Sequence, residues 1–163
     1  MLKKYLLVFS CFIILVDYYT KWLIDSNMAL HESIEVIPGL LNITYVRNMG
    51  VAFGMFSDFN AAITLSVISA GAILFLLYLL FVTEDNKTAE LFAISLIIGG
   101  AAGNLIDRVQ QQGVVDFVDF HIGASHWPAF NVADSAITIG MALFIYVIIF
   151  NQEEKKEHIE TNE

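Results

Sequence analysis

ELFAISLIIGGAAGNLIDR, residues 90–108, is the stretch of sequence that decides the fold. Its apolar part approaches the roughly 20 residues that a helix needs to cross about 30 Å of hydrocarbon. The small residues from Gly99 to Gly103 form a smooth helical face on which another helix can approach closely. We therefore expect a membrane-spanning helix at residues 89–106 that packs tightly against a neighbouring helix.

Three further apolar stretches lie on either side of this span, at residues 5–24, 61–82 and 132–150. The composition of the whole chain agrees with a membrane protein. Of the 163 residues, 57% are hydrophobic and only 15% are charged, whereas soluble domains carry about 25% charged residues. The sequence therefore predicts an all-α integral membrane protein with four transmembrane helices, formed by a single domain that covers residues 1–163.

The basic residues near the spans predict how the chain crosses the membrane. The four spans place five lysines on the same side of the membrane: Lys3, Lys4, Lys87, Lys155 and Lys156. The opposite loops, residues 25–60 and 107–131, hold only Arg47 and Arg108. By the positive-inside rule, both termini should face the cytoplasm. The acidic tail, residues 151–163, is then a solvated cytoplasmic end.

The first span has an alternative interpretation as a cleaved signal peptide, because two lysines precede an apolar run in which Val8–Cys11 resembles a lipobox. The apolar stretch before Cys11 is short for that role, and it continues to Val16. We therefore expect a retained helix. Cys11 is the single cysteine, which excludes an intramolecular disulfide, and we expect it to be a small buried residue.

The two outer connections are long, and long loops often carry function. In Leu41–Val46, the side chains alternate with the period of two that is typical of a strand. We expect this strand to belong to a small extracytoplasmic β-sheet that lies on the membrane surface. The following segment contains Phe53, Phe56 and Phe59, which suit the headgroup region as an interfacial anchor. We also expect a short interfacial helix in the outer loops.

Polar residues gather at the outer ends of the spans. Asp17 and Lys21 are four residues apart, which places them on one helical face as an ion pair that supports the helix bundle. Asn104, Asp107 and Arg108 give a second face an amide, a carboxylate and a guanidinium. An ion-paired helix end would explain this face. An asparagine at membrane depth also indicates a hydrogen bond to something bound between helices.

Two aspartates follow these polar faces along the chain: Asp116 lies in VVDFVDF and Asp134 lies in FNVADS. Asn131 and Asp134 resemble a helix-capping box, which would explain both residues. Burial among valines and phenylalanines would disfavour ionisation of Asp116 and Asp119. The sharper hypothesis is that Asp116 and Asp134 meet as an aspartyl dyad. One carboxyl then keeps a proton, and the other activates water for attack on a carbonyl carbon.

Other functions lack their usual sequence patterns. The chain has no G-x-S-x-G motif and no evident Ser–Lys pair, which argues against a serine hydrolase. His121 and His126 lack H-E-x-x-H spacing and cysteine partners, so we expect no metal site and no cofactor. The net charge of -9 argues against nucleic acid as a partner. A transporter or channel remains an alternative, because Asp17, Lys21 and Asp134 lie within spans.

Five blocks of the sequence together resemble the bacterial lipoprotein signal peptidase family, also called signal peptidase II. The blocks are DYYTK, NMGVAF, GGAAGNLIDR, VVDF and FNVADS. Each block alone is a weak signal, but all five occur in the right order and at the right membrane depth. The resemblance covers nearly the whole chain and implies a four-span membrane aspartyl peptidase.

The resemblance also implies roles for individual residues. The catalytic pair falls on Asp116 and Asp134. The residues expected to bind or position substrate are Asn48, Gly50, Asn104, Arg108 and Asn131. Those expected to support the site are Asp17, Lys21 and Asp107. Asn48 and Gly50 would belong to the sheet that cradles the substrate, and Asn131 would orient the segment that bears Asp134.

The implied reaction removes the signal peptide from a prolipoprotein whose lipobox cysteine already carries diacylglycerol, with cleavage just before that cysteine. The implied partners are this substrate and membrane lipid, and the cyclic peptide globomycin would block the dyad. The implied location is the bacterial cytoplasmic membrane, with the site near its outer face, where the scissile bond of a lipid-anchored substrate lies. We expect a monomer that needs no cofactor.

Overall fold

The structure, a computed structural model, describes residues 1–50 and 59–160. In chain order the elements are α1 (Leu2–Asn27), β1 (Ser33–Ile37), β2 (Leu41–Asn48), α2 (Phe59–Val82), α3 (Thr88–Gln111), β3 (Val114–Ile122), β4 (Ser125–His126) and α4 (Val132–Glu160). The segments long and apolar enough to cross a membrane are Leu2–Asn27, Ala62–Val82, Thr88–Gln111 and Val132–Phe150. The prediction of four helices that can span a membrane is confirmed.

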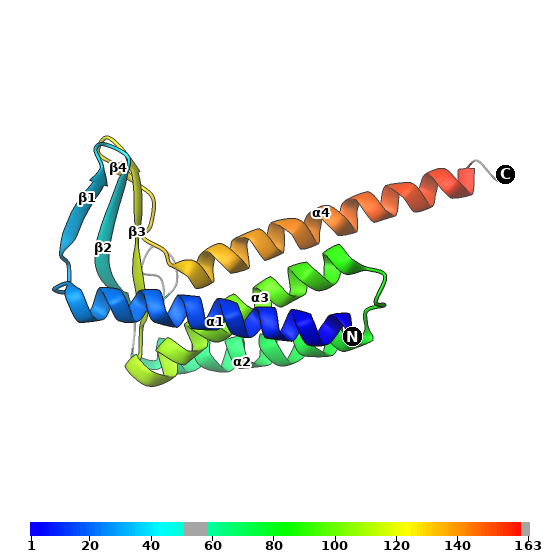
Figure 1. Cartoon of the computed structure of the whole chain (residues 1–163), viewed down its shortest axis with the longest axis horizontal. Coiled ribbons are helices and arrows are strands. Elements are labelled where there is room, and N and C mark those ends of the chain that lie inside the picture. The colour runs from blue at the N-terminus through cyan, green and yellow to red at the C-terminus, as the bar shows by residue number, and fades with distance from the viewer. Residues whose placement is uncertain (51–58, 161–163) are drawn as a thin grey trace.

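The central helix of the bundle is α3, which packs against each of the other three helices (Figure 1). Of its apolar window, 56% is buried, compared with 22% or less in the other helices. Its glycines make the approach possible. A Cβ atom on Gly99 would lie 2.9 Å from Ile13 Cβ in α1, and one on Gly100 would collide with the Ala133 carbonyl oxygen in α4. The predicted close approach of a neighbouring helix is confirmed.

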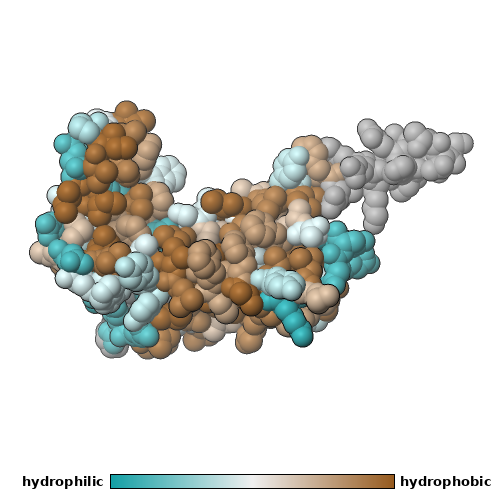
Figure 2. Space-filling model, in the orientation of Figure 1, coloured by the Kyte–Doolittle hydropathy of each residue, from teal (hydrophilic) through white to brown (hydrophobic). Residues whose placement is uncertain are grey.

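The outer surfaces of the helices are apolar. Figure 2 shows a largely hydrophobic surface along the helices on the face in view. Large apolar side chains such as Leu15, Val67, Leu74 and Ile145 are exposed there and elsewhere on the helices, as side chains that face lipid are. Cys11 is also exposed, so the expectation of a buried cysteine is wrong. A small apolar side chain suits lipid contact as well as the protein interior.

The two long connections form one antiparallel sheet with the strand order β1-β2-β3-β4. In Figure 1 the sheet stands at one end of the helices, and the N-terminus and the α2–α3 connection lie at the other end. The predicted strand at residues 41–46 is confirmed and continues to Asn48, which pairs with Val114 of β3. The sheet therefore joins the first outer connection to the second.

Side-chain contacts attach the sheet to α1 at one end of the helix bundle and the N-terminus to α2 at the other end. At the sheet end, the Tyr45 hydroxyl donates to the Asp25 carboxylate in the last turn of α1, and Arg47 pairs with the same carboxylate at 3.2 Å. At the opposite end, Lys3 Nζ donates to the Phe81 carbonyl at the end of α2, at 2.8 Å. The sheet is thus anchored to α1, and the N-terminus is anchored to α2.

The described parts of the outer connections, residues 28–50 and 112–131, form strands, turns and irregular segments without a helix. Of the anchor predicted at Phe53, Phe56 and Phe59, the first two residues fall outside the described residues, and Phe59 begins α2. The short interfacial helix therefore stays a prediction.

Candidate active site

Asp116 and Asp134 reach one cavity from two different elements. Asp116 lies in β3 and is 3% exposed, and Asp134 lies in the first turn of α4. Both line a cavity of about 730 Å³ whose walls come from the sheet, from α2, α3 and α4, and from the segment that precedes α4. The structure brings the two predicted acids together, although they are 18 positions apart along the chain.

Asn131 and Asp134 form the predicted capping box at the start of α4. The Asp134 amide donates to Asn131 Oδ1 at 2.9 Å, and the Asn131 amide donates to Asp134 Oδ2 at 3.2 Å. This cap leaves the other carboxylate oxygen free for a further bond. Asp134 Oδ1 accepts from Asn104 Nδ2 at 2.7 Å. The same side chain therefore caps the helix and lines the cavity.

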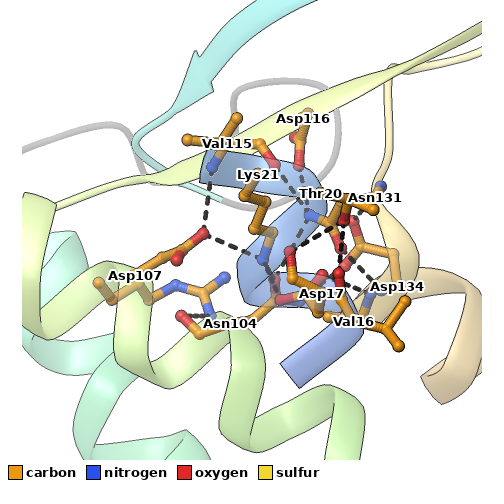
Figure 3. Close-up of polar contacts among 12 residues, drawn as sticks. Val16, Asp17, Thr20, Lys21, Asn104, Asp107, Val115, Asp116, Asn131 and Asp134 are labelled. Atoms are coloured by element: carbon orange, nitrogen blue, oxygen red, sulfur yellow. Dashed lines mark hydrogen bonds and ion pairs between the residues drawn. The ribbon is translucent and has the colours of Figure 1, made fainter. Parts of the chain in front are cut away.

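Asp116 accepts hydrogen bonds from two asparagines. Asn48 Nδ2 donates to its Oδ2 at 3.0 Å. Asn131 Nδ2 donates to its Oδ1 at 2.7 Å (Figure 3). Burial and the nearby charge of Asp134 raise the pKa of Asp116 to about 6, against the opposing effect of these two hydrogen bonds. The Asp116 carboxyl is therefore suited to hold a proton near neutral pH.

The three residues predicted to support the site form a buried ion cluster beside the acids (Figure 3). Lys21 Nζ lies 2.7 Å from Asp17 Oδ2 and 3.0 Å from Asp107 Oδ2. Asp17 Oδ1 also accepts from the Ala133 amide of α4 at 2.8 Å, and Asp107 Oδ2 accepts from the Val115 amide of β3 at 3.3 Å. The cluster joins the helices and the sheet at the point where the acids meet.

Asn104 lines the cavity, but its side chain is engaged by protein groups. Its Oδ1 accepts from Lys21 Nζ at 3.0 Å and from Asn131 Nδ2 at 3.4 Å. Its Nδ2 donates to Asp134. The side chain therefore links the ion cluster to the acids, which differs from the substrate contact that the sequence suggests.

The remaining predicted residues, Asn48, Gly50 and Arg108, also line the cavity. The Gly50 amide donates to Asn48 Oδ1 at 3.0 Å, so the turn after β2 holds the Asn48 side chain in place. Arg108 lies within electrostatic range of Asp116 and Asp134. Its guanidinium offers hydrogen-bond donors to a carbonyl group that enters the cavity.

Asp119 lies on the same strand as Asp116 but does not line the cavity. Its carboxylate accepts from Asn42 Nδ2 and pairs with His126 Nδ1, each at 2.8 Å. Burial alone would raise the pKa of Asp119, but these partners lower it. The expectation of suppressed ionisation is therefore wrong for Asp119, because the sequence does not reveal which polar groups surround an acid.

The structure adds apolar walls that the sequence did not single out. Leu65 of α2 and Ile137 and Ile139 of α4 line the cavity, together with Trp127 and Phe130 from the segment before α4. Such residues occur throughout any membrane span, so no sequence signal separates these from lipid-facing ones. The packing of α2 and α4 around α3 decides which of them reach the site.

A protein-family model described as Signal peptidase (SPase) II matches residues 9–150. The chain belongs to the signal peptidase II family. Curated relatives named lipoprotein signal peptidase agree with this assignment. The relative from Desulforapulum autotrophicum is 46% identical over 146 residues, which cover 88% of this chain and 90% of the relative. The relative from Syntrophus aciditrophicus is 41% identical over 168 residues, which cover 94% of this chain and 99% of the relative.

Two solved structures, each described as a bacterial membrane enzyme, share the fold of this signal peptidase II family member. The first has a TM-score of 0.84 and 38% identity, and the match covers 94% of this chain and 93% of the other. The second has a TM-score of 0.77 and 38% identity, with coverage of 89% and 92%. The chain is therefore a multi-pass membrane protein, and its family makes it a peptidase.

Proposed function

We propose that the chain is an aspartyl endopeptidase that removes signal peptides from diacylglyceryl-modified prolipoproteins. The observation that carries this proposal is that Asp116 and Asp134 line one cavity and share Asn131 as a hydrogen-bond donor. The name of the relatives, lipoprotein signal peptidase, supports the substrate class. Cleavage falls just before the lipid-modified cysteine, as the family resemblance implies. A monomer suffices, because one chain supplies both acids.

In the proposed reaction, a water molecule attacks the carbonyl carbon of the scissile peptide bond. Asp134 accepts a proton from the water, and Asp116 donates its proton to the carbonyl oxygen. The C–N bond then breaks as the leaving amine takes the proton from Asp134. A hydroxyl group of the tetrahedral intermediate returns a proton to Asp116 as the new carboxyl group forms. The two acids end in their starting protonation states, and the sequence of steps needs no cofactor.

The cavity suits an apolar substrate that is anchored in the membrane. Its walls combine apolar side chains, such as Leu65 and Ile139, with the guanidinium of Arg108. The apolar walls would hold the signal peptide and the acyl chains, and Arg108 would donate to a peptide carbonyl near the acids. Cyclic peptides of the globomycin type would compete for the same cavity.

The active site lies near the outer face of the bacterial cytoplasmic membrane in this proposal. Exposed apolar side chains on the sheet, including Ile34, Val36 and Ile122, support a sheet that rests on the membrane surface (Figure 2). Lys3 and the α2–α3 connection lie together at the far end of the bundle. The positive-inside rule then gives both termini a cytoplasmic location.

The position of the polar groups favours a peptidase over a transporter. A transport path needs polar side chains near the middle of the membrane. Here the ion cluster of Asp17, Lys21 and Asp107 bonds directly to β3, and Asp116 bonds to Asn48 of β2. The charged groups therefore meet at the end of the bundle that carries the sheet.

Purified protein in detergent, mixed with a diacylglyceryl-modified prolipoprotein, tests this proposal. We expect mass spectrometry to find a free signal peptide and a product that begins with the lipid-modified cysteine. A matched substrate with serine in place of that cysteine cannot carry the thioether-linked lipid and should stay intact. Cleavage at another bond, or equal cleavage of the two substrates, would contradict the proposal.

A further inference from the structure

Three asparagines surround the two acids, and each is oriented by a partner that can only donate. An asparagine amide has an acceptor oxygen and a donor nitrogen, so an obligate donor at the oxygen decides where the nitrogen points. The Gly50 amide donates to Asn48 Oδ1, and the Asp134 amide donates to Asn131 Oδ1. The side-chain nitrogens of both asparagines then point to Asp116.

Asn104 differs from the other two because its obligate donor is a side chain from another helix. Lys21 Nζ of α1 lies 3.0 Å from Asn104 Oδ1, and an ammonium group carries donors only. Asn104 Nδ2 must therefore face the other way, where it donates to Asp134 Oδ1 at 2.7 Å. Lys21 is 3% exposed and is held by Asp17 and Asp107, which fixes the position of its ammonium group.

We propose that Lys21 is a positioning residue for peptide hydrolysis, because it orients the Asn104 amide so that Asn104 Nδ2 donates to Asp134, the proposed acceptor of the water proton. This inference rests on the proposed aspartyl dyad and gives Lys21 a role beyond support of the bundle. If the Asn104 amide turned over, its oxygen would face the Asp134 carboxylate, and its nitrogen would face an ammonium group. Both contacts would be repulsive, so Lys21 favours one orientation of the amide. The longer contact from Asn131 Nδ2 to Asn104 Oδ1, at 3.4 Å, favours the same orientation.

The charges around Asp134 explain why this single donor matters. Among the described residues, the charged groups beside Asp116 and Asp134 are Arg108, Lys21, Asp17 and Asp107. The described residues of α2 that line the cavity, Leu65 and Ser69, are uncharged. Two carboxylates already neutralise Lys21 at contact distance. Its influence on Asp134 therefore runs through the Asn104 amide more than through direct attraction.

The substitution Asn104→Asp tests the inference most sharply. The new side chain keeps the shape of asparagine and, when ionised, still accepts from Lys21, but it no longer offers Asp134 an N–H donor. We expect kcat to fall on the order of 100-fold, as on loss of one preorganised donor. The acidic limb of the pH profile of kcat should move to higher pH, because the dyad takes up a second proton more readily.

A matched control is Asn42→Asp, because Asn42 makes the same type of hydrogen bond to Asp119 outside the cavity. This variant should keep the kcat and the pH profile of the wild type. A merely structural role for Asn104 would lower stability without a shift of the pH profile. Thermal unfolding of each variant therefore accompanies the kinetics.

Variants of Lys21 test the direction of the amide. Lys21→Gln replaces an obligate donor with an amide that can also accept, whereas Lys21→Arg keeps a cation that only donates. We expect Lys21→Gln to lower kcat by about tenfold or more and to shift the acidic limb to higher pH. Lys21→Arg should have a higher kcat than Lys21→Gln, and the acidic limb of its pH profile should lie closer to that of the wild type.

Assays of Asp116→Asn and Asp134→Asn under the same conditions show whether a negative result concerns the role of Lys21 or the aspartyl dyad itself. If both are inactive while folded Asn104→Asp keeps the wild-type kcat and pH profile, Lys21 is not a positioning residue. If either aspartate variant keeps wild-type turnover, the dyad is wrong and the inference falls with it.

Discussion

At the scale of single residues, the positions of the Asp116 and Asp134 carboxylates depend on the side-chain and backbone amides that donate hydrogen bonds to them. Asn131 donates to Asp116 through its side chain and to Asp134 through its backbone. Since the Asp134 amide donates back to Asn131, the relative position of the two carboxylates is fixed from both sides. A geometry set before substrate enters is what acid–base catalysis requires, because no reorganisation is then needed during the reaction.

Asn48→Ala removes one of the two asparagine donors to the Asp116 carboxylate. Burial already raises the pKa of Asp116 to about 6, and the loss of a donor to the anion should raise this pKa further. The alkaline limb of kcat/KM, where the dyad loses its proton, should therefore move to higher pH. A pH profile checks this, with Asn42→Ala as the control. Movement of the limb to lower pH would contradict the proposed proton on Asp116.

The sequence was enough to predict that Asp116 and Asp134 meet, because both stand beside the outer ends of spans. It did not predict that Asn104 contacts Asp134, since that contact depends on how closely α3 and α4 pack. Nor did it distinguish Asp119 from Asp116, because the two acids lie in similar sequence surroundings. The difference comes from Asn42 and His126, which are brought to Asp119 by strand pairing.

At the scale of elements, the glycine face of α3 sets the positions of α1 and α4. A Cβ atom on Gly103 would lie 2.6 Å from Asp17 Oδ2 and 3.4 Å from Ala133 Cβ. The glycines therefore allow the ion cluster and the first turn of α4 to approach the same stretch of α3. Close helix packing and the geometry of the site are consequences of the same residues.

Gly100→Ala should destabilise the protein, because the added methyl group would collide with the Ala133 carbonyl of α4. Overpacking of this kind costs about 1–3 kcal/mol in free energy of unfolding. Thermal unfolding in detergent measures the effect. The matched control is Gly71→Ala in α2, where an added Cβ has no neighbour within 4 Å. Equal stability of the two variants would show that α3 and α4 are not packed closely.

Tyr45→Phe should loosen the sheet, because it removes the hydroxyl group that donates to Asp25 at the end of α1. The loss of one such hydrogen bond costs about 1 kcal/mol. Amide hydrogen exchange in β1 and β2 should accelerate, while exchange in α3 should not change. Tyr19→Phe, on an exposed part of α1, is the control. Unchanged exchange in Tyr45→Phe would mean that this contact does not anchor the sheet.

The predicted spans were shorter than the observed helices, and the reason is physical. Hydropathy predicted a span at residues 5–24, whereas α1 covers Leu2–Asn27. It predicted a span at residues 89–106, whereas α3 continues to Gln111. Hydropathy detects the part of a helix that suits hydrocarbon, but backbone hydrogen bonding continues into the polar region. The added turn of α3 holds Asp107 and Arg108, which belong to the site.

At the scale of the whole molecule, the lysines of the N-terminus and of the α2–α3 connection, Lys3, Lys4 and Lys87, lie at the end of the bundle opposite the candidate site. The N-terminus and the α2–α3 connection occupy one end, and the sheet occupies the other (Figure 1). The sequence predicted this separation because the positive-inside rule depends only on loop composition. The full strand order was not predictable, because β3 lacks strict alternation and is buried over its first four residues.

Cysteine labelling tests the orientation in the membrane. In a Cys11→Ala background, Ser125→Cys in the sheet and Asn86→Cys in the α2–α3 connection each supply a single exposed thiol. A membrane-impermeant maleimide should label Ser125→Cys in cells with a permeable outer envelope and an intact cytoplasmic membrane. It should label Asn86→Cys only after the cytoplasmic membrane is opened. The reverse pattern would contradict a site at the outer face.

In the proposed reaction, Asp116 and Asp134 together hydrolyse the peptide bond of a lipid-modified prolipoprotein. The most direct measurement is turnover of that substrate by Asp116→Asn and Asp134→Asn, with Asp119→Asn as the matched control on the same strand. We predict that both dyad variants fold but lose at least about 1,000-fold in kcat, while the control retains wild-type turnover. Wild-type turnover in either dyad variant would contradict the account.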